Sequence, residues 1–205
     1  MSESELLAHY VERGGEPWNV SLEAAWLEYE LRAWVRPRLP TRWPARACNI
    51  GIGVGLWDDW LGHELGVSIT SIDLDPQICR TFAARQRRER HPYPAHVICG
   101  DARDLSGEID GHLRDARQGR RLGSCGGTAG GTAWAFDAIT IVGSTLAETA
   151  DRDAIERAAR AALAPEGVLL VAEVGNRAPP HADEVRFLGT GRDRIWIAFH
   201  ALTAT

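Results

Sequence analysis

The chain of 205 residues has no lysine, no C-x-x-C pair and no long apolar run. We attribute the missing lysine to coding bias and give it no mechanistic meaning. A helix that spans a bilayer needs ~20 consecutive apolar residues, so no membrane protein is expected. The N-terminus, Met1-Ser-Glu-Ser-Glu, is acidic and not apolar. We therefore predict no secretory signal and a cytoplasmic location.

Metal sites and nucleic acids are also poorly supported. Cys48, Cys79, Cys99 and Cys125 are far apart, and no histidine lies beside them at ligand spacing. Structural zinc sites need closely spaced ligand pairs, so no metal is predicted. The formal net charge is −5. Because proteins that bind nucleic acid usually present a basic face, the charge disfavours a nucleic acid partner.

Strand and helix patterns alternate from residue 47 onward. We expect strands over 47–50, 67–72, 96–99, 136–142 and 167–174, with helices over 56–65, 76–90 and 151–163. This alternation predicts a parallel sheet with helices on both faces. Two further apolar segments, 185–188 and 194–200, flank a Gly-rich turn and predict an antiparallel C-terminal hairpin. The expected fold is α/β, doubly wound and mostly parallel.

The length suits a single domain. Residues 1–44 are expected to form a helical cap in two pieces, broken at Gly14-Gly15-Glu16-Pro17, and residues 45–205 a Rossmann-like core. The second piece carries apolar residues at helical spacing: Leu22, Ala25, Trp26, Tyr29 and Trp34. Glycines interrupt any apolar period between residues 107 and 134. This predicts a flexible insertion, with a lid over the substrate as the alternative.

Three motifs follow the first three strands in order. Asn49-Ile-Gly51-Ile-Gly53-Val-Gly55 opens a helix, Asp73 ends the second strand, and Gly100-Asp101-Ala102 follows the third. Glycines permit a sharp turn and close approach of a ligand, and the helix N-terminus offers N–H groups to an anion. Because parallel strands end on one rim, the three motifs are expected to lie together.

The two carboxylates predict a nucleoside ligand. Asp73 can accept hydrogen bonds from both hydroxyls of a ribose; alternatively it caps the helix that starts near Pro76, which Asp75 could do instead. Asp101 can accept from the exocyclic amine of adenine; alternatively it is a surface carboxylate in a plain turn. A dinucleotide oxidoreductase is disfavoured, because the third glycine of its G-x-G-x-x-G fingerprint would fall on Leu56.

From about residue 47 onward, the chain resembles the class I, Rossmann-like S-adenosylmethionine-dependent methyltransferases. The resemblance is carried by the three motifs together with Phe136-Asp-Ala-Ile-Thr-Ile-Val142, Leu163-Ala-Pro-Glu-Gly-Val-Leu-Leu-Val171 and the closing hairpin. It implies a seven-stranded sheet and S-adenosylmethionine as the cofactor. Its methionyl carboxylate would then be the anion at the helix N-terminus.

The resemblance also assigns residues to that cofactor. It implies contacts from Gly51, Gly53 and Gly55, Asp73 at the ribose, Leu74 and Ala102 beside the adenine, Asp101 at its amine, and Val142 nearby. One position departs from the pattern. Many members carry an acidic residue where this chain has Asn49. An amide keeps hydrogen bonding but lacks the negative charge near the cofactor's ammonium, which bears on how tightly the cofactor binds.

No residue stands out as a general base. Glu148 and His181 are candidates by position, while a helix-start carboxylate and a surface histidine are the plainer interpretations. Tyr10 and Trp18 are predicted to line the substrate pocket. We predict methyl transfer to a small molecule, in specialised metabolism, with no nucleic acid and no membrane partner. The alternatives are a non-catalytic cofactor-binding protein and a methyltransferase of protein or RNA.

Two tryptophans and a run of arginines are expected to have structural and not functional roles. Trp57 and Trp60 follow the glycine turn and are expected to pack, although one could face the cofactor's sulfonium. The run Arg85-Gln-Arg-Arg-Glu-Arg90 predicts a solvated helix face, with RNA binding as the alternative.

Overall fold

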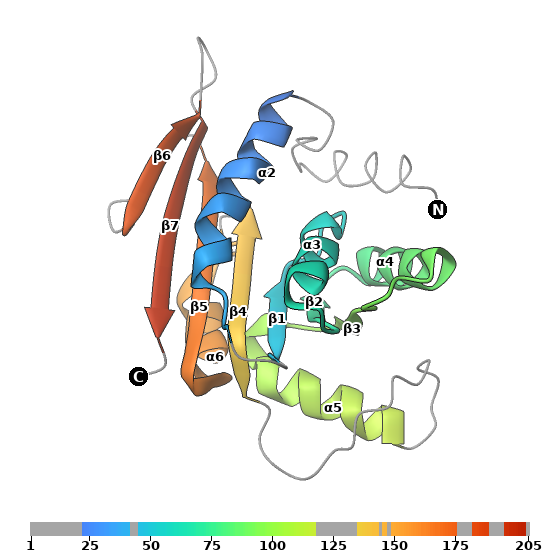
Figure 1. The fold of residues 1–205 in the computed structure, drawn as a ribbon. Helices are drawn as coiled ribbons and strands as arrows, with labels where there is room; N and C mark the ends of the chain where they lie inside the picture. Colours follow the sequence, from blue (N-terminus) through green and yellow to red (C-terminus); the bar gives the residue numbers. More distant parts are fainter. Residues whose placement is uncertain are drawn as a thin grey trace.

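The computed structural model describes residues 22–41, 45–117, 135–143, 145–146, 149–175, 182–188 and 195–203. These residues form a seven-stranded sheet in the order β3-β2-β1-β4-β5-β7-β6 (Figure 1). The strands are β1 (Ala47–Ile50), β2 (Thr70–Asp73), β3 (His96–Cys99), β4 (Phe136–Gly143), β5 (Leu163–Gly175), β6 (Glu184–Leu188) and β7 (Ile195–Thr203). β1 to β5 are parallel, and β7 runs antiparallel to β5 and β6. The predicted fold class, with its antiparallel hairpin, is confirmed.

Helices connect the strands and cover both faces of the sheet. The α-helices are α2 (Leu22–Val35), α3 (Leu56–Leu65), α4 (Pro76–Glu89), α5 (Leu105–Arg117) and α6 (Arg152–Ala161), and the 3-10 turns are η2 (Arg36–Arg38) and η3 (Ala102–Asp104). Strand side chains alternate between the two faces. In β4, Ile139 and Ile141 pack with α5 and α6, whereas Ala138, directly before them, packs with α2 and α3. Each strand therefore contributes to two cores.

The strands next to the glycine turn end level with one another. Ile50 is paired with Ile72 on one side and with Ile141 on the other, and Ile72 is paired with Ile98. The motifs that follow β1, β2, β3 and β4 therefore leave the sheet on the same rim, as the sequence predicts.

Three local expectations need correction. Residues 105–117 form a helix, although a flexible insertion is expected from residue 107; Leu105 and Ile109 are buried one turn apart, which outweighs the helix cost of Gly107. β5 begins at Leu163 instead of residue 167, because a register shift beside Phe136 accommodates Pro165. Tyr29, expected on the apolar stripe of α2, is 65% exposed.

Several other expectations fall outside the described residues. They are the first N-terminal helix and the rest of the insertion over 118–134. Within the described part of the chain, no helix has the length and apolar character needed to cross a bilayer.

Candidate functional site

The three glycines of the turn after β1 have positive φ angles, but their surroundings differ. The angles are 88° at Gly51, 54° at Gly53 and 77° at Gly55. A Cβ atom on Gly51 would lie 2.1 Å from the Oγ1 of Thr145, and one on Gly55 would lie 2.4 Å from the ring of Phe82. A Cβ on Gly53 would meet no atom of the described residues within 4 Å. Two of the glycines therefore serve internal packing, and only Gly53 borders open space.

Asp73 ties the end of β2 to this turn. Its Oδ2 accepts from the backbone N–H of Ile52 (2.8 Å) and more weakly of Gly53 (3.5 Å), and its Oδ1 accepts from the N–H of Asp75 (2.9 Å). Asp75 caps α4 by accepting from the N–H of Gln77 at 2.7 Å, so the capping alternative for Asp73 is wrong. Burial raises the pKa of Asp73, against the effect of these hydrogen bonds. A carboxylate has about four acceptor sites, so capacity remains for a further donor.

Asp101 lies beside Asp73 on the rim but is already occupied. Gly100 donates its N–H to the carbonyl of Asp73 at 3.0 Å, which joins the ends of β2 and β3. The carboxylate of Asp101 accepts from the backbone N–H of Arg103 (2.9 Å) and forms an ion pair with its guanidinium. The hydrogen bonds from Arg103 lower the pKa of Asp101. An adenine amine at Asp101 would have to compete with this exposed arginine.

The predicted apolar contacts occupy different environments. Leu74, directly after β2, is 71% exposed, which leaves its side chain free to contact a ligand. Ala102 and Val142 are partly buried and pack against the cores on opposite faces of the sheet. Tyr10, Trp18, Glu148 and His181 lie outside the described residues.

Asn49 belongs to a buried polar cluster beneath the turn. Its amide nitrogen donates to the carbonyl of Gly51 (2.9 Å) and to Oδ1 of Asp58 (3.0 Å), and its amide oxygen accepts from the hydroxyl of Thr140 (2.8 Å). Ser71 donates to the same oxygen of Asp58 at 2.5 Å. Oδ2 of Asp58 is buried without a hydrogen-bond partner in the described part of the chain. The cluster thus links β1, β2, β4 and α3.

Asp58 was missed by the sequence analysis. A signal for it exists, because Asp58, Leu61 and Leu65 share one helical face and all three are buried. Burial raises the pKa of Asp58 from 3.8 to about 7, against the lowering effect of the hydrogen bonds from Ser71 and Asn49. A carboxylic acid at this position changes charge near neutral pH.

We expect Asp58 to make the protein less stable as pH rises. Between pH 3.8 and about 7 the folded protein holds a proton that the unfolded chain has lost, so the free energy of unfolding falls across this interval. Asp58→Asn removes the titration. We therefore compare the melting temperature of the variant minus that of the wild type at two pH values. This difference should be larger at about pH 8 than at about pH 5. Asp153→Asn, at an exposed position of α6, is the matched control and should show no such difference.

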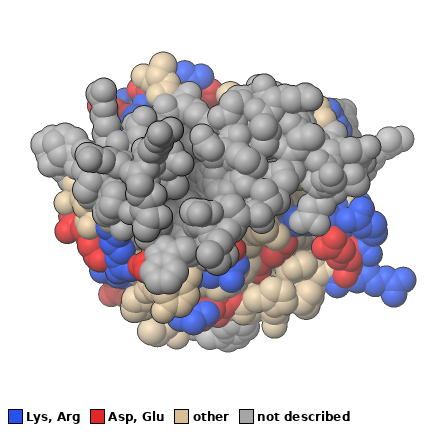
Figure 2. All heavy atoms as spheres, turned by 90° about the horizontal axis from the view of Figure 1, so that it is seen from above, with Lys and Arg blue, Asp and Glu red and all other residues tan. Residues whose placement is uncertain are grey.

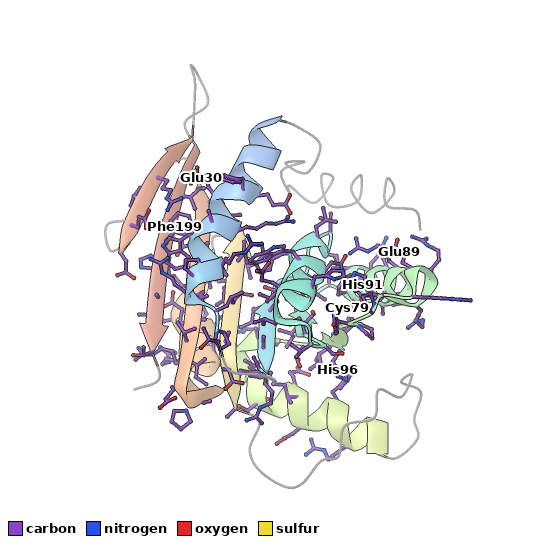
Figure 3. All side chains as sticks on the ribbon, in the orientation of Figure 1. Glu30, Cys79, Glu89, His91, His96 and Phe199 are labelled. Carbon is purple, nitrogen blue, oxygen red and sulfur yellow. The ribbon has the colours of Figure 1, made fainter. Side chains whose placement is uncertain are left out.

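A second buried cluster supports the turn from α4. His91, which follows α4 and is labelled in Figure 3, lies at the edge of this cluster. Arg85 donates to the carbonyl of Val54 at 2.7 Å and forms an ion pair with Asp59 of α3. Gln86 donates to the same carboxylate, and Nε2 of His91 lies 3.5 Å from it. The sequence predicts that the basic run is a solvated helix face. This prediction is wrong for Arg85, whose side chain is buried.

The two tryptophans of α3 have partners within the protein. Trp57 donates its indole N–H to the hydroxyl of Thr140 at 3.2 Å and contacts the ring of Trp60, with centroids 4.7 Å apart. The guanidinium groups of Arg32 and Arg36 lie 5.5 and 5.9 Å from the centre of the Trp60 ring. Trp60 therefore takes part in packing α2 against α3.

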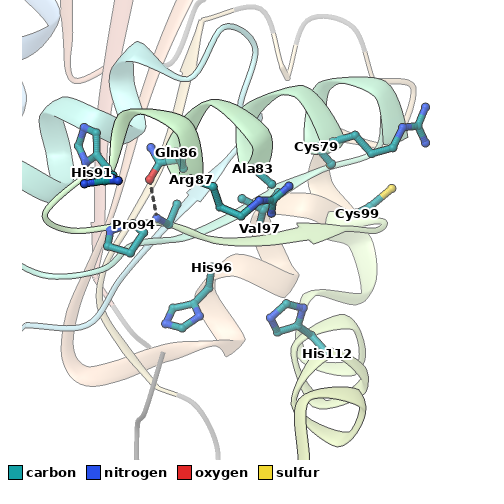
Figure 4. Close-up of a pocket in the computed structure, with 13 residues that line it drawn as sticks. Cys79, Ala83, Gln86, Arg87, His91, Pro94, His96, Val97, Cys99 and His112 are labelled. Carbon is teal, nitrogen blue, oxygen red and sulfur yellow. Dashed lines mark hydrogen bonds between the residues drawn. The ribbon is translucent and has the colours of Figure 1, made fainter. Parts of the chain in front are cut away.

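A hollow of about 830 Å³ lies between α4, β3 and α5, outside the candidate site (Figure 4). Arg80, Arg87, His96 and His112 are among the residues that line it, and none of the described residues that line it is acidic. It borders the side of α4 that carries Ala83, whereas Phe82 and Arg85 of the same helix contact the glycine turn.

No known protein family and no curated protein matches the sequence. Solved structures do match. The N-methyltransferase NodS from Bradyrhizobium japonicum WM9, in complex with S-adenosylhomocysteine, gives a TM-score of 0.57 at 16% identity, over 90% of this chain and 91% of that one. The glycopeptide N-methyltransferase MtfA with S-adenosylhomocysteine gives 0.50 at 16% identity, over 84% and 58%. The chain has the class I methyltransferase fold.

This methyltransferase fold also occurs in a protein named for another reaction. The [4+2]-cyclase SpnF gives a TM-score of 0.53 at 21% identity, over 74% of this chain and 47% of that one. The chain thus spans about half the length of SpnF. At these identities the likeness is one of fold, and a fold alone does not fix a reaction. The site itself has to carry the functional argument.

Proposed function

We propose that the chain binds S-adenosylmethionine on the rim formed by the glycine turn, Asp73 and Asp101, and transfers its methyl group to a small molecule. The observation that carries this proposal is the open space beside Gly53, bordered by the Asp73 carboxylate. A cofactor can approach the backbone there without meeting a side chain of the described residues. The N-terminus of α3 provides N–H groups for the cofactor's carboxylate.

The remaining rim residues fit the other parts of this cofactor. Asp73 keeps an acceptor site for ribose hydroxyls, and Leu74 exposes an apolar side chain suited to one face of an adenine. Asp101 can accept from the adenine amine once Arg103 moves aside, and Val142 borders the rim after β4. These roles are the ones that the methyltransferase resemblance implies.

The bound cofactor supplies an activated methyl group with its own leaving group, so the protein mainly has to position the acceptor. An amine acceptor needs only to be neutral. Figure 2 shows acidic and basic side chains interspersed on the described part of the face seen there. With the net charge of −5, this favours a small molecule over a nucleic acid. A cytoplasmic location remains part of the proposal.

Calorimetric titration with S-adenosylhomocysteine, beside NAD⁺, tests the cofactor. We expect micromolar binding of S-adenosylhomocysteine and none of NAD⁺. Asp73→Asn should weaken binding by ~10-fold or more, because the loss of a charged acceptor costs about 1.5–3 kcal/mol. Asp75→Asn is the matched control two residues away, since an asparagine caps a helix as well as an aspartate does.

The proposed cofactor is wrong if S-adenosylhomocysteine does not bind, or if both aspartate variants bind it equally well. A non-catalytic cofactor-binding protein remains the second candidate, favoured by the amide that Asn49 places where many class I methyltransferases carry an acidic residue. Incubation with S-adenosylmethionine and a panel of amines and hydroxylated metabolites separates the two. Formation of S-adenosylhomocysteine that depends on the acceptor supports methyl transfer, whereas binding without turnover supports the second candidate.

A further inference from the structure

Asp58 is a carboxyl group in the interior without a cation. Its residue is 2% exposed, and its two hydrogen-bond donors, the amide of Asn49 and the hydroxyl of Ser71, are neutral. Its second oxygen has no partner in the described part of the chain. Burial of an unpaired carboxylate is costly, so near neutral pH a substantial fraction of the molecules keeps this proton until a cation comes near.

The surroundings of Asp58 supply no such cation within the described residues. Asp59, next in α3, acts on Asp58 with a negative charge, and its own cation is Arg85. On β1, Cys48 is a buried thiol whose pKa burial raises, with a smaller contribution from Asp58. The side chains that reach the cluster from β2 and β4 are the hydroxyls of Ser71 and Thr140. Beyond the described residues of the chain, the cation that such a group can meet is a ligand's.

We infer that Asp58 is the positioning carboxyl group for the ammonium group of the cofactor's methionyl end, and that it loses its proton when that group binds. The inference rests on the proposed function. Asp58 lies in the first turn of α3, whose N-terminus is the proposed site for the methionyl carboxylate, and the ammonium is on the same carbon. The O–H bond of Asp58 breaks, the proton passes to the buffer, and the carboxylate remains near the ammonium.

This arrangement also explains the amide at position 49. The amide nitrogen of Asn49 donates hydrogen bonds to the carbonyl of Gly51 and to the carboxyl of Asp58. Its distance to Oδ1 of Asp58 is 3.0 Å. An acidic residue at position 49 would bring two carboxyl groups into contact, and two such groups cannot both ionise readily. The negative charge of the site therefore lies on Asp58 of α3 instead of on a residue of β1. The amide of Asn49 stands between this charge and the carbonyl of Gly51 in the turn.

Calorimetry of S-adenosylhomocysteine in two buffers of different ionisation enthalpy measures the protons released on binding. At about pH 7, where Asp58 titrates, the wild type should release a substantial fraction of one proton per ligand. Asp58→Asn should release none, and at about pH 8 it should bind ~10-fold more weakly, because a nearby opposite charge shifts a pKa by 1–3 units. Methylthioadenosine, which lacks the amino-acid end, should bind both proteins equally and release no proton.

The double variant Asn49→Asp/Asp58→Asn carries the carboxyl group on β1 instead of α3. It should recover most of the affinity that Asp58→Asn alone loses. Proton release that persists in Asp58→Asn, or its absence in the wild type, overturns the inference. A proton released with S-adenosylmethionine but not with S-adenosylhomocysteine also overturns it, because the sulfonium would then be the partner. Failure of S-adenosylhomocysteine to bind the wild type at any pH instead refutes the proposed function.

Discussion

Gly53→Ala is expected to weaken binding of S-adenosylhomocysteine by about 10- to 100-fold while the protein stays folded. The added methyl group would meet no atom within 4 Å in the part of the chain that the structure describes, so we expect the fold to bear the cost of a left-handed residue, roughly 1–2 kcal/mol. The same methyl group would occupy the space in which the cofactor approaches the turn. Overpacking a contact by one carbon costs about 1–3 kcal/mol, which corresponds to a loss of affinity of roughly 10- to 100-fold.

The matched control is Gly66→Ala. Gly66 also has a positive φ, 62°, but it ends α3 and lies at the opposite end of that helix from the turn. Its substitution should lower the melting temperature to a similar degree and leave the affinity unchanged. Equal affinity in Gly53→Ala and the wild type would show that the open space beside Gly53 is not where the cofactor lies.

The order of the elements could be predicted because it depends on local patterns. Short apolar segments, glycine turns and Pro76 after Asp75 indicate where β1, α3 and α4 begin, and these bounds agree with the structure. The errors arise where tertiary packing outweighs local propensity. Gly107 and the other glycines near it suggest a loop, but burial of Leu105 and Ile109 holds that segment in a helix.

The site could be predicted as a set of positions but not as a set of interactions. The sequence shows three glycines of one kind, whereas the structure separates Gly53, which borders open space, from Gly51 and Gly55, which make room for Thr145 and Phe82. The partners of Asn49 also depend on packing, because Asp58, nine residues later, reaches it only when α3 folds onto β1. Such contacts are set by three-dimensional neighbours that no local pattern reveals.

Arg85→Met should cause the largest loss of stability of any substitution considered. The side chain of Arg85 is 8% exposed and that of its partner Asp59 is 17% exposed. Removal of the arginine leaves a largely buried carboxylate without its cation and the carbonyl of Val54 without its donor. Breaking a buried pair from one side costs about 3–5 kcal/mol, which lowers the melting temperature by roughly 10 °C in a chain of this size.

Two comparisons identify the cause of that loss. Arg88→Met changes an arginine three residues away on the same helix whose side chain is 63% exposed, so it should cost less than about 0.5 kcal/mol. Asp59→Asn in the Arg85→Met background removes the unpaired charge and should restore part of the stability. The recovery should be partial, because the neighbours that remain, Gln86 and His91, satisfy only some of the hydrogen-bonding groups of the new amide. If the double variant is instead as unstable as the sum of the two single variants, the two side chains act independently. In that case the ion pair between α3 and α4 does not hold the glycine turn in place.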